Sequence, residues 1–483
     1  MDYISIIFYI FVLVTVILYY LFPTKQRWII LLCANIAFYV IVAKESVVLF
    51  VLTIIFSWIA GLGIDKLENS SVKSNIKKLF LAGMIIVVIS PLFIVKYSNF
   101  ALSLVGRNSM LNLVVPIGIS YYSLQMISYL VDISRGRIKP EINLLKYALY
   151  ISFFPQILQG PIARYSQMKD QFHREYKFDE TTFVKGIQLV VWGFFLKMMI
   201  ADKAAVIVNE IFDNYEMYVG WYVIIAGTLY SIQLYADFLA CVTISQGVAM
   251  LFGIEVIDNF KHPYSATSVK EFWHKWHISL STWLRDYIYI PLGGNRRGRI
   301  FKYCNLMCTF LVSGVWHGAG FKYIFWGMLH GIYQIVEDIT MPIRNYIWES
   351  AMLDKIKVLR DYWAKLVTFI CIMLAWIVFR ADSLRIAVNM LKNIVKVNNI
   401  WIFFDGSITR LGLSSKQVMV LCVSIGIMYV VSKCQQKICV RDYILKQNLL
   451  VRWGLYVGSV IIILVLGTYG YGFDAQNFIY GGF

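Results

Sequence analysis

Two histidines lie inside an apolar stretch that is long enough to cross a membrane. Residues 310–331 read FLVSGVWHGAGFKYIFWGMLHG and contain His317 and His330, although the whole chain has only six histidines. An imidazole exchanges a proton near neutral pH, which suits general acid–base catalysis. Ionisable groups in a membrane segment usually face a polar cavity, but a neutral imidazole can also be satisfied by a neighbouring helix. This stretch alone leaves both roles open.

Two further histidines lie in an amphipathic stretch, SVKEFWHKWHISLSTWLRDYIY (268–289). At about 100° per residue, its large apolar side chains share an arc of roughly 80°; they are Trp273, Trp276, Leu280, Trp283 and Tyr287. We therefore predict an interfacial helix over 268–289 whose aromatic face turns inward or into lipid. His274 lies among the charged residues and is expected on the solvated surface, whereas His277 borders the aromatic face and could look into a cavity. No third ligand accompanies this pair, so no metal site is predicted.

A dense basic loop follows this stretch, with the sequence PLGGNRRGRIFK (291–302). Its glycines permit sharp bends, and its basic residues are Arg296, Arg297, Arg299 and Lys302. An ordinary cytoplasmic loop is one interpretation. A landing site for a phosphate-bearing donor is the other, because arginine guanidinium groups match phosphate oxygens.

The composition predicts that these elements belong to an all-α polytopic membrane protein. The chain has 483 residues, of which 59% are hydrophobic and 15% charged, and apolar runs of membrane-spanning length recur throughout. Its net charge of +17 comes from basic residues that cluster between these runs, as the positive-inside bias produces, so no nucleic-acid partner is expected.

The predicted spans number about eleven or twelve, because proline and glycine interrupt several apolar runs. The runs lie near 3–22, 28–43, 46–63, 79–95, 110–131, 144–158, 186–200, 217–239, 303–317, 320–337, 364–380, 418–432 and 453–469. The clearest interruption is ISFFPQILQGPIARY (151–165). Basic loops near 25–27, 65–78, 135–139 and 432–452 are expected in the cytoplasm, which places both termini outside.

Three stretches resemble the membrane-bound O-acyltransferase family. They are FFPQILQGPIARY, DNFKHPYSATSVKEFWHKWHISLSTWLRDYIYIPLGGNRRG and GVWHGAGFKYIFWGMLHG. The similarity is greatest to the bacterial alginate O-acetylation branch, with teichoic-acid D-alanylation proteins as a more distant branch, and is close over 110–340. Where the branch usually reads something like YFDFSGYSD, this chain has YADFLACVT (235–243) and keeps only Asp237 of the two aspartates.

The resemblance implies a fold and a set of site residues. The fold would be one membrane-embedded domain over 1–483, a helical bundle with broken and interfacial helices around a transmembrane tunnel. His317 matches the family's essential histidine and would act as general base, and His277 matches its partner, which would orient or polarise a thioester carbonyl. His330 matches a frequent histidine position of the family, and Asp237 would stabilise the site's charge or hydrogen-bond between helices.

The resemblance also implies an activity and partners. An acyl group, most simply acetyl from acetyl-CoA, would pass from the cytoplasm to a hydroxyl of a polysaccharide outside a bacterial plasma membrane, with an SGNH-type transferase as an extracellular partner. Tyr480, near the C-terminal end, would relay the acyl group or anchor the tail at the lipid interface. The alternatives are D-alanyl transfer to teichoic acid and a non-enzymatic role in polysaccharide transport or assembly.

Overall fold

The computed structural model describes residues 3–106, 111, 113–350 and 357–469. Throughout these ranges the regular elements are helices and no strand occurs, so the all-α prediction is confirmed. Eight of the described helices are long and apolar enough to cross a membrane, which makes the chain a multi-pass membrane protein. This count rests on length and composition over the described residues and leaves out the shorter apolar helix Ile6–Leu21, so the expected eleven or twelve spans stay a prediction.

Short and broken helices account for part of the difference. The predicted span 144–158 is divided into α6 (Leu144–Ser152) and the four-residue α7 (Phe154–Ile157). Pro155 lies at the start of α7 and has no N–H to continue the preceding helix. The predicted span 110–131 overlaps α5 (Ile119–Ser134), which has 16 residues. The break between α6 and α7 at Pro155 confirms the predicted interruption within 151–165.

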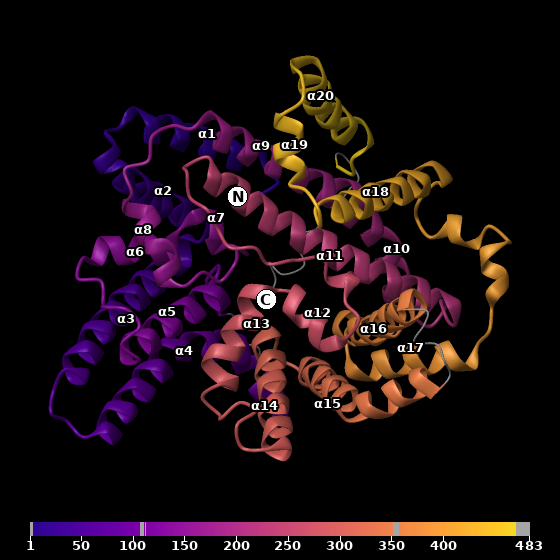
Figure 1. The fold of residues 1–483 in the computed structure, drawn as a ribbon, viewed down its shortest axis with the longest axis horizontal. Coiled ribbons are helices and arrows are strands. Elements are labelled where there is room, and N and C mark those ends of the chain that lie inside the picture. Colours follow the sequence, from indigo (N-terminus) through magenta and orange to yellow (C-terminus); the bar gives the residue numbers. More distant parts are fainter. Residues whose placement is uncertain (1–2, 107–110, 112, 351–356, 470–483) are drawn as a thin grey trace. The chain divides into compact units, whose positions relative to one another are not determined.

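The chain folds into two compact units, Met1–Val190 with Ile244–Ile257 and Val191–Thr243 with Asp258–Gly482. The first unit contains α1 (Ile6–Leu21), α2 (Arg27–Val42), α3 (Val47–Glu68), α4 (Ser74–Leu104), α5, α6, α7, α8 (Tyr165–His173) and most of α9 (Glu180–Phe194). Within it, α3 and α4 pack beside α5, which is buried from Ile119 to Ile133 (Figure 1). A single domain over 1–483 stays a prediction.

The second unit contains the histidine-bearing segments. Its helices are α10 (Asp202–Asp213), most of α11 (Trp221–Met250), α12 (Val269–Lys275), α13 (Ile278–Leu284), α14 (Arg299–His317), α15 (Phe321–Ser350), α16 (Lys357–Arg380), α17 (Leu384–Lys396), α18 (Ser415–Cys434), α19 (Val440–Leu445) and α20 (Leu449–Leu466). Helix α15 packs against α14 and α16, and α12 packs against α15 and α16 (Figure 1).

Helices α14 and α15 approach each other closely enough for their backbones to touch. A Cβ atom added to Gly314 would overlap the carbonyl oxygen of Tyr323 on α15, and one added to Gly327 would overlap the carbonyl oxygen of Phe310 on α14. Small residues permit such close helix packing in membranes. This contact fixes the position of His317 on α14 relative to His330 on α15.

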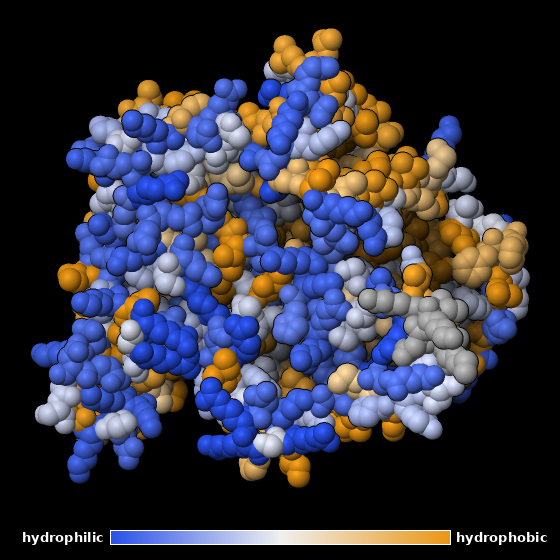
Figure 2. Space-filling model, viewed as in Figure 1, coloured by the Kyte–Doolittle hydropathy of each residue, from blue (hydrophilic) through white to orange (hydrophobic). Residues whose placement is uncertain are grey.

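The last long helices expose their apolar side chains. Figure 2 shows hydrophobic residues gathered over α18, where the exposed side chains include Met419, Val423, Ile427 and Val430. Helix α20 likewise buries only Ile463 among its residues. Such surfaces are expected of helices that face lipid.

Candidate active site

A sharp corner at His277 replaces the single helix predicted over 268–289. Helix α12 ends at Lys275, α13 begins at Ile278, and a π-helical turn covers Arg285–Tyr289. His277 adopts a left-handed conformation, with φ of 45°, which an α-helix cannot contain. The expectation of one continuous helix was therefore wrong, because periodicity does not reveal a single residue that leaves the helical region.

The predicted aromatic face is nonetheless correct. Its five members are all buried in the protein: Trp273, Trp276, Leu280, Trp283 and Tyr287. His274 is exposed and His277 is 1% exposed, which matches the separation that the helical angles predicted.

Asn259 holds the corner in place. Its backbone oxygen accepts the N–H of Ile278 at 3.0 Å, and its side-chain oxygen accepts the N–H of Ser279 at 3.0 Å. These are the first N–H groups of α13, which have no partner within the helix. Asn259 is itself buried, and its two hydrogen bonds to the start of α13 hold His277 in its strained, left-handed conformation.

The structure brings His277, His317 and His330 into one buried aromatic cluster. Their exposed fractions are 1%, 1% and 0%. The ring of Trp316 contacts both His277 and His317, with centroids 6.3 and 4.9 Å away. The ring of Trp326 contacts both His317 and His330, at 4.9 and 4.8 Å. The two tryptophans thus connect the three imidazoles in sequence.

His330 has an assigned hydrogen bond on one nitrogen. The indole Nε1–H of Trp273 donates to His330 Nδ1 at 3.2 Å. A neutral imidazole that accepts at Nδ1 carries its proton on Nε2. The Nε2 atom is buried and has no hydrogen-bond partner among the described residues.

His277 is suited to act as a neutral group. Burial removes water from its charged form and lowers the pKa of the imidazole to about 3. A neutral imidazole can donate one hydrogen bond and accept another, so His277 can orient a polar substrate group without adding a charge.

Asp237 belongs to a buried ion-pair cluster. The Lys197 ammonium lies 2.8 Å from Asp237 and 2.9 Å from Asp202, and all three side chains are almost fully buried. Lys197 lies in a π-helical turn, Phe195–Ala201, and Asp237 on α11. The neighbour of Asp237 in the chain, Phe238, packs its ring 4.8 Å from that of His277. Asp237 thus forms an ion pair with Lys197, while its neighbour in the chain, Phe238, contacts the histidine cluster.

Sequence reasoning missed Lys197 and Asp202. The available signal was a lysine inside the predicted span 186–200, because intramembrane charges are rare and usually paired. Within the described part of the chain, no group of three His, Cys, Asp or Glu side chains is placed to hold a metal ion.

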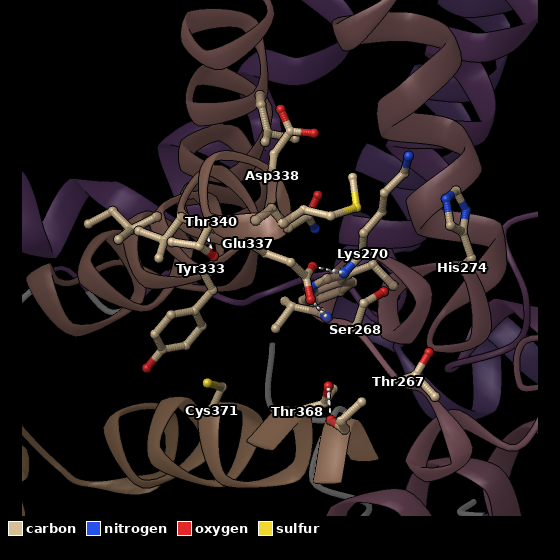
Figure 3. A pocket seen from close by; sticks show the side chains of 18 of the residues that line it. Thr267, Ser268, Lys270, His274, Tyr333, Glu337, Asp338, Thr340, Thr368 and Cys371 are labelled. Atoms are coloured by element: carbon tan, nitrogen blue, oxygen red, sulfur yellow. Dashed lines mark hydrogen bonds between the residues drawn. The ribbon is translucent and has the colours of Figure 1, made fainter. Parts of the chain in front are cut away.

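A large open cavity of about 1800 Å³ lies beside the histidine cluster in the second unit. Trp273, Phe310 and Tyr333 line it, and the rings of these three residues also contact that of His330. Figure 3 shows Glu337 reaching from α15 to the start of α12, where it accepts the N–H groups of Val269 and Lys270. The cavity thus reaches the wall that encloses His330, while His277 and His317 lie outside its lining.

The four basic residues predicted to bind the donor do not share one position. Lys302 lines the cavity and forms an ion pair with Asp338 at 2.7 Å. Arg296, Arg297 and Arg299 are exposed and outside the cavity lining. Gly293, Gly294 and Gly298 have positive φ angles, which confirms the predicted bends of this loop. The donor-binding roles of the four basic residues, like the catalytic roles of the histidines, stay predictions. Tyr480 lies outside the described residues.

Comparisons with known proteins place this chain in a family. The model of the membrane-bound O-acyltransferase family matches residues 72–379. The chain belongs to this family. It is accordingly an O-acyltransferase, and its histidine cluster lies within the matched region.

Several curated relatives cover most of the chain. The probable alginate O-acetylase AlgI of Pseudomonas syringae pv. tomato is 34% identical over 77% of this chain and 71% of its own length. The peptidoglycan O-acetyltransferase of Helicobacter pylori is 32% identical over 79% of this chain and 75% of its own. The teichoic acid D-alanyltransferase of Bacillus subtilis is 28% identical over 52% of this chain and 66% of its own. The branch predicted from the motifs is confirmed.

Proposed function

We propose that the protein transfers an acetyl group from cytoplasmic acetyl-CoA to a hydroxyl of a polysaccharide outside a bacterial plasma membrane. The observation that carries the proposal is the burial of His277 and His317 against the same tryptophan, Trp316. Relatives named for alginate and peptidoglycan O-acetylation support the acetyl group and the glycan acceptor. Both termini would face outside.

In this reaction, His317 removes the proton of the attacking hydroxyl as that oxygen bonds to the thioester carbonyl carbon. The carbon–sulfur bond then breaks, and the proton passes to the leaving thiolate. His277, neutral through burial, holds the thioester carbonyl in position. The donor enters through the cavity, where Lys302 and neighbouring basic side chains contact its phosphates.

Reconstituted vesicles test the proposal. Radiolabelled acetyl-CoA is supplied on one face of the bilayer, and acetylated oligosaccharide is measured on the other, with alginate, peptidoglycan and neutral glycan fragments as acceptors. Vesicles that carry His317→Ala are the matched control. Label that stays with the donor in wild-type vesicles, for every acceptor and with a secreted SGNH-type transferase added, would contradict the proposal.

D-alanyl transfer to teichoic acid is the second candidate, because a relative named for that activity matches half of the chain. The same vesicles distinguish the two reactions when a D-alanyl thioester replaces acetyl-CoA. Turnover of the D-alanyl thioester alone would favour the second candidate, whereas transport of unmodified glycan without acyl transfer would favour a transport or assembly role.

Tyr480 offers a test of how the acyl group leaves. A relay through its phenol requires the hydroxyl, whereas an interfacial anchor requires only the ring. A relay predicts that Tyr480→Phe keeps membrane insertion and lowers transfer to the secreted acceptor about tenfold or more, because the ring remains while the acyl-carrying oxygen is lost. Wild-type transfer by this variant would identify the tail as an anchor.

A further inference from the structure

Ser313 differs from the other hydroxyl side chains that line the cavity. Seven serine or threonine side chains besides Ser313 line it, and each has a hydrogen bond within the protein; they are Thr267, Ser268, Ser281, Thr282, Thr309, Thr340 and Thr368. One turn before Ser313 on the same helix, Thr309 donates to the carbonyl oxygen of Asn305 at 2.7 Å. The Ser313 hydroxyl has no partner among the described residues.

The hydroxyl of Ser313 is also fully buried. Its side chain is 0% exposed although it lines the cavity, so it belongs to the cavity's inner wall. Buried polar groups are nearly always hydrogen-bonded, and an exception requires an explanation. A serine in a helix normally has the carbonyl oxygen of the preceding turn within reach, so its lack of a partner is a feature of this position.

Ser313 lies one helical turn before His317. Four residues of α-helix advance about 6 Å along the axis, and side chains at i and i+4 share a face. The inner wall of the cavity at Ser313 therefore adjoins the position from which His317 would act on a bound substrate.

Two other buried polar atoms nearby lack partners within the described part of the chain. They are Nε1 of Trp326, whose ring packs against that of His317, and Nε2 of His330. An indole N–H can only donate, and His330 donates at Nε2 because Trp273 occupies Nδ1. A group that satisfied either of these two atoms would therefore be an acceptor such as a carbonyl oxygen, although neither residue lines the cavity itself.

We propose that Ser313 is a catalytic residue of this enzyme and donates a hydrogen bond to the thioester carbonyl of the acyl donor. This inference rests on the proposed function. As the acceptor oxygen bonds to the carbonyl carbon and the thiolate leaves, negative charge develops on the carbonyl oxygen, where the Ser313 hydroxyl stabilises it. Ser313 forms and breaks no covalent bond, and the proton of the acceptor hydroxyl still passes through His317.

Ser313→Ala separates this role from a structural one. We expect kcat with acetyl-CoA to fall about 100-fold, in the range known for loss of one such donor, and the donor KM to change less than about threefold. The same variant should have an unchanged or raised Tm, because it removes a buried hydroxyl that has no partner among the described residues. Ser313→Cys, which keeps a weak donor of similar size, should retain intermediate activity.

Ser231→Ala is the matched control. Ser231 is equally buried in the same unit, but it donates to the carbonyl oxygen of Gly227 at 2.7 Å and does not line the cavity. This variant should lose some stability and keep its kcat. The proposal requires the opposite pattern for Ser313→Ala.

Three results would overturn the assignment of Ser313. They are a wild-type kcat in Ser313→Ala, a lowered Tm with a proportional loss of activity, and an acetylated Ser313 found by mass spectrometry, since the last would make Ser313 a nucleophile. If the wild-type protein does not turn over acetyl-CoA, the proposed function fails. The Tm of Ser313→Ala then decides the separate claim that this hydroxyl lacks a partner in the free protein, and a lowered Tm refutes that claim.

Discussion

The second unit contains two buried groups of polar side chains that are stabilised in different ways. Lys197 lies between Asp202 and Asp237, so each charge in that cluster has an opposite charge within 2.9 Å. The histidine cluster is enclosed by aromatic rings, and its donors at Trp326 and His330 have no partner among the described residues. Paired charges hold elements together, whereas neutral groups with unused nitrogen atoms can take part in a reaction. We therefore predict a structural role for the first cluster and a chemical role for the second.

His317→Ala should produce the largest loss of activity. Removing a general base lowers turnover by about 10²–10⁴-fold, and we expect about 10³-fold here with an unchanged Tm. Initial rates of acetyl transfer by the purified protein measure the effect. Turnover near the wild-type rate, in a variant that elutes as a single species, would assign the base elsewhere in the cluster.

Lys197→Met should have a large effect on stability. It leaves two carboxylates buried without their cation, and breaking a buried ion pair costs about 3–5 kcal/mol. We expect a Tm well below that of the wild type in detergent micelles. Combining it with Asp202→Asn and Asp237→Asn should restore much of the Tm, because neither carboxylate is then left buried without the Lys197 cation. Loss of activity at a normal Tm in Lys197→Met would instead place this cluster in the chemistry.

The two histidines of the corner should behave differently. His277→Ala is expected to lower kcat about 100-fold, because the thioester loses an orienting group in the site. His274→Ala should change kcat less than about twofold, since His274 is an exposed residue of the cavity lining and lies outside the buried histidine cluster. Steady-state kinetics of both variants measure the difference, and equal losses would show that the buried and exposed sides of this corner have the same role.

The arginine loop should have the smallest effect. Replacing Arg296, Arg297 and Arg299 with alanine is expected to raise the donor KM about three- to tenfold and to leave kcat nearly constant. The reason is that exposed guanidinium groups would contact the phosphates of CoA, far from the reacting carbonyl. The same experiment with a short thioester that lacks the nucleotide is the control. An unchanged KM for acetyl-CoA would leave these residues as determinants of topology only.

Much of this arrangement could be predicted from the sequence because it depends on patterns that repeat along the chain. The apolar runs predicted a polytopic helical protein, and the angular arc of Trp273 to Tyr287 predicted which side of that segment is buried. The same angles separated His277 from His274. These inferences hold because burial follows the side-chain period whatever the neighbouring helices are.

The rest depends on single residues whose role is set by distant contacts. The corner at His277 requires Asn259, which lies 18 positions earlier in the chain and leaves no periodic signal. Lys197 forms an ion pair with Asp237, which lies 40 positions later in the chain. Ser313 resembles any small residue in an apolar helix until the hydrogen bonds of its neighbours are compared with its own. Such contacts join residues that are distant in the sequence, so they can be recognised only in the folded structure.

The backbone contact between Gly314 and the start of α15 has a consequence for the surrounding lipid. Membrane helices tilt when the bilayer becomes thinner or thicker. Helices α14 and α15 are not among the eight described helices of spanning length and apolarity, but they touch main chain to main chain and therefore move as one body when the helices around them tilt. His317 and His330 therefore keep their separation when acyl-chain length changes, and a response of this enzyme to membrane thickness would have to arise outside the helix pair that carries them.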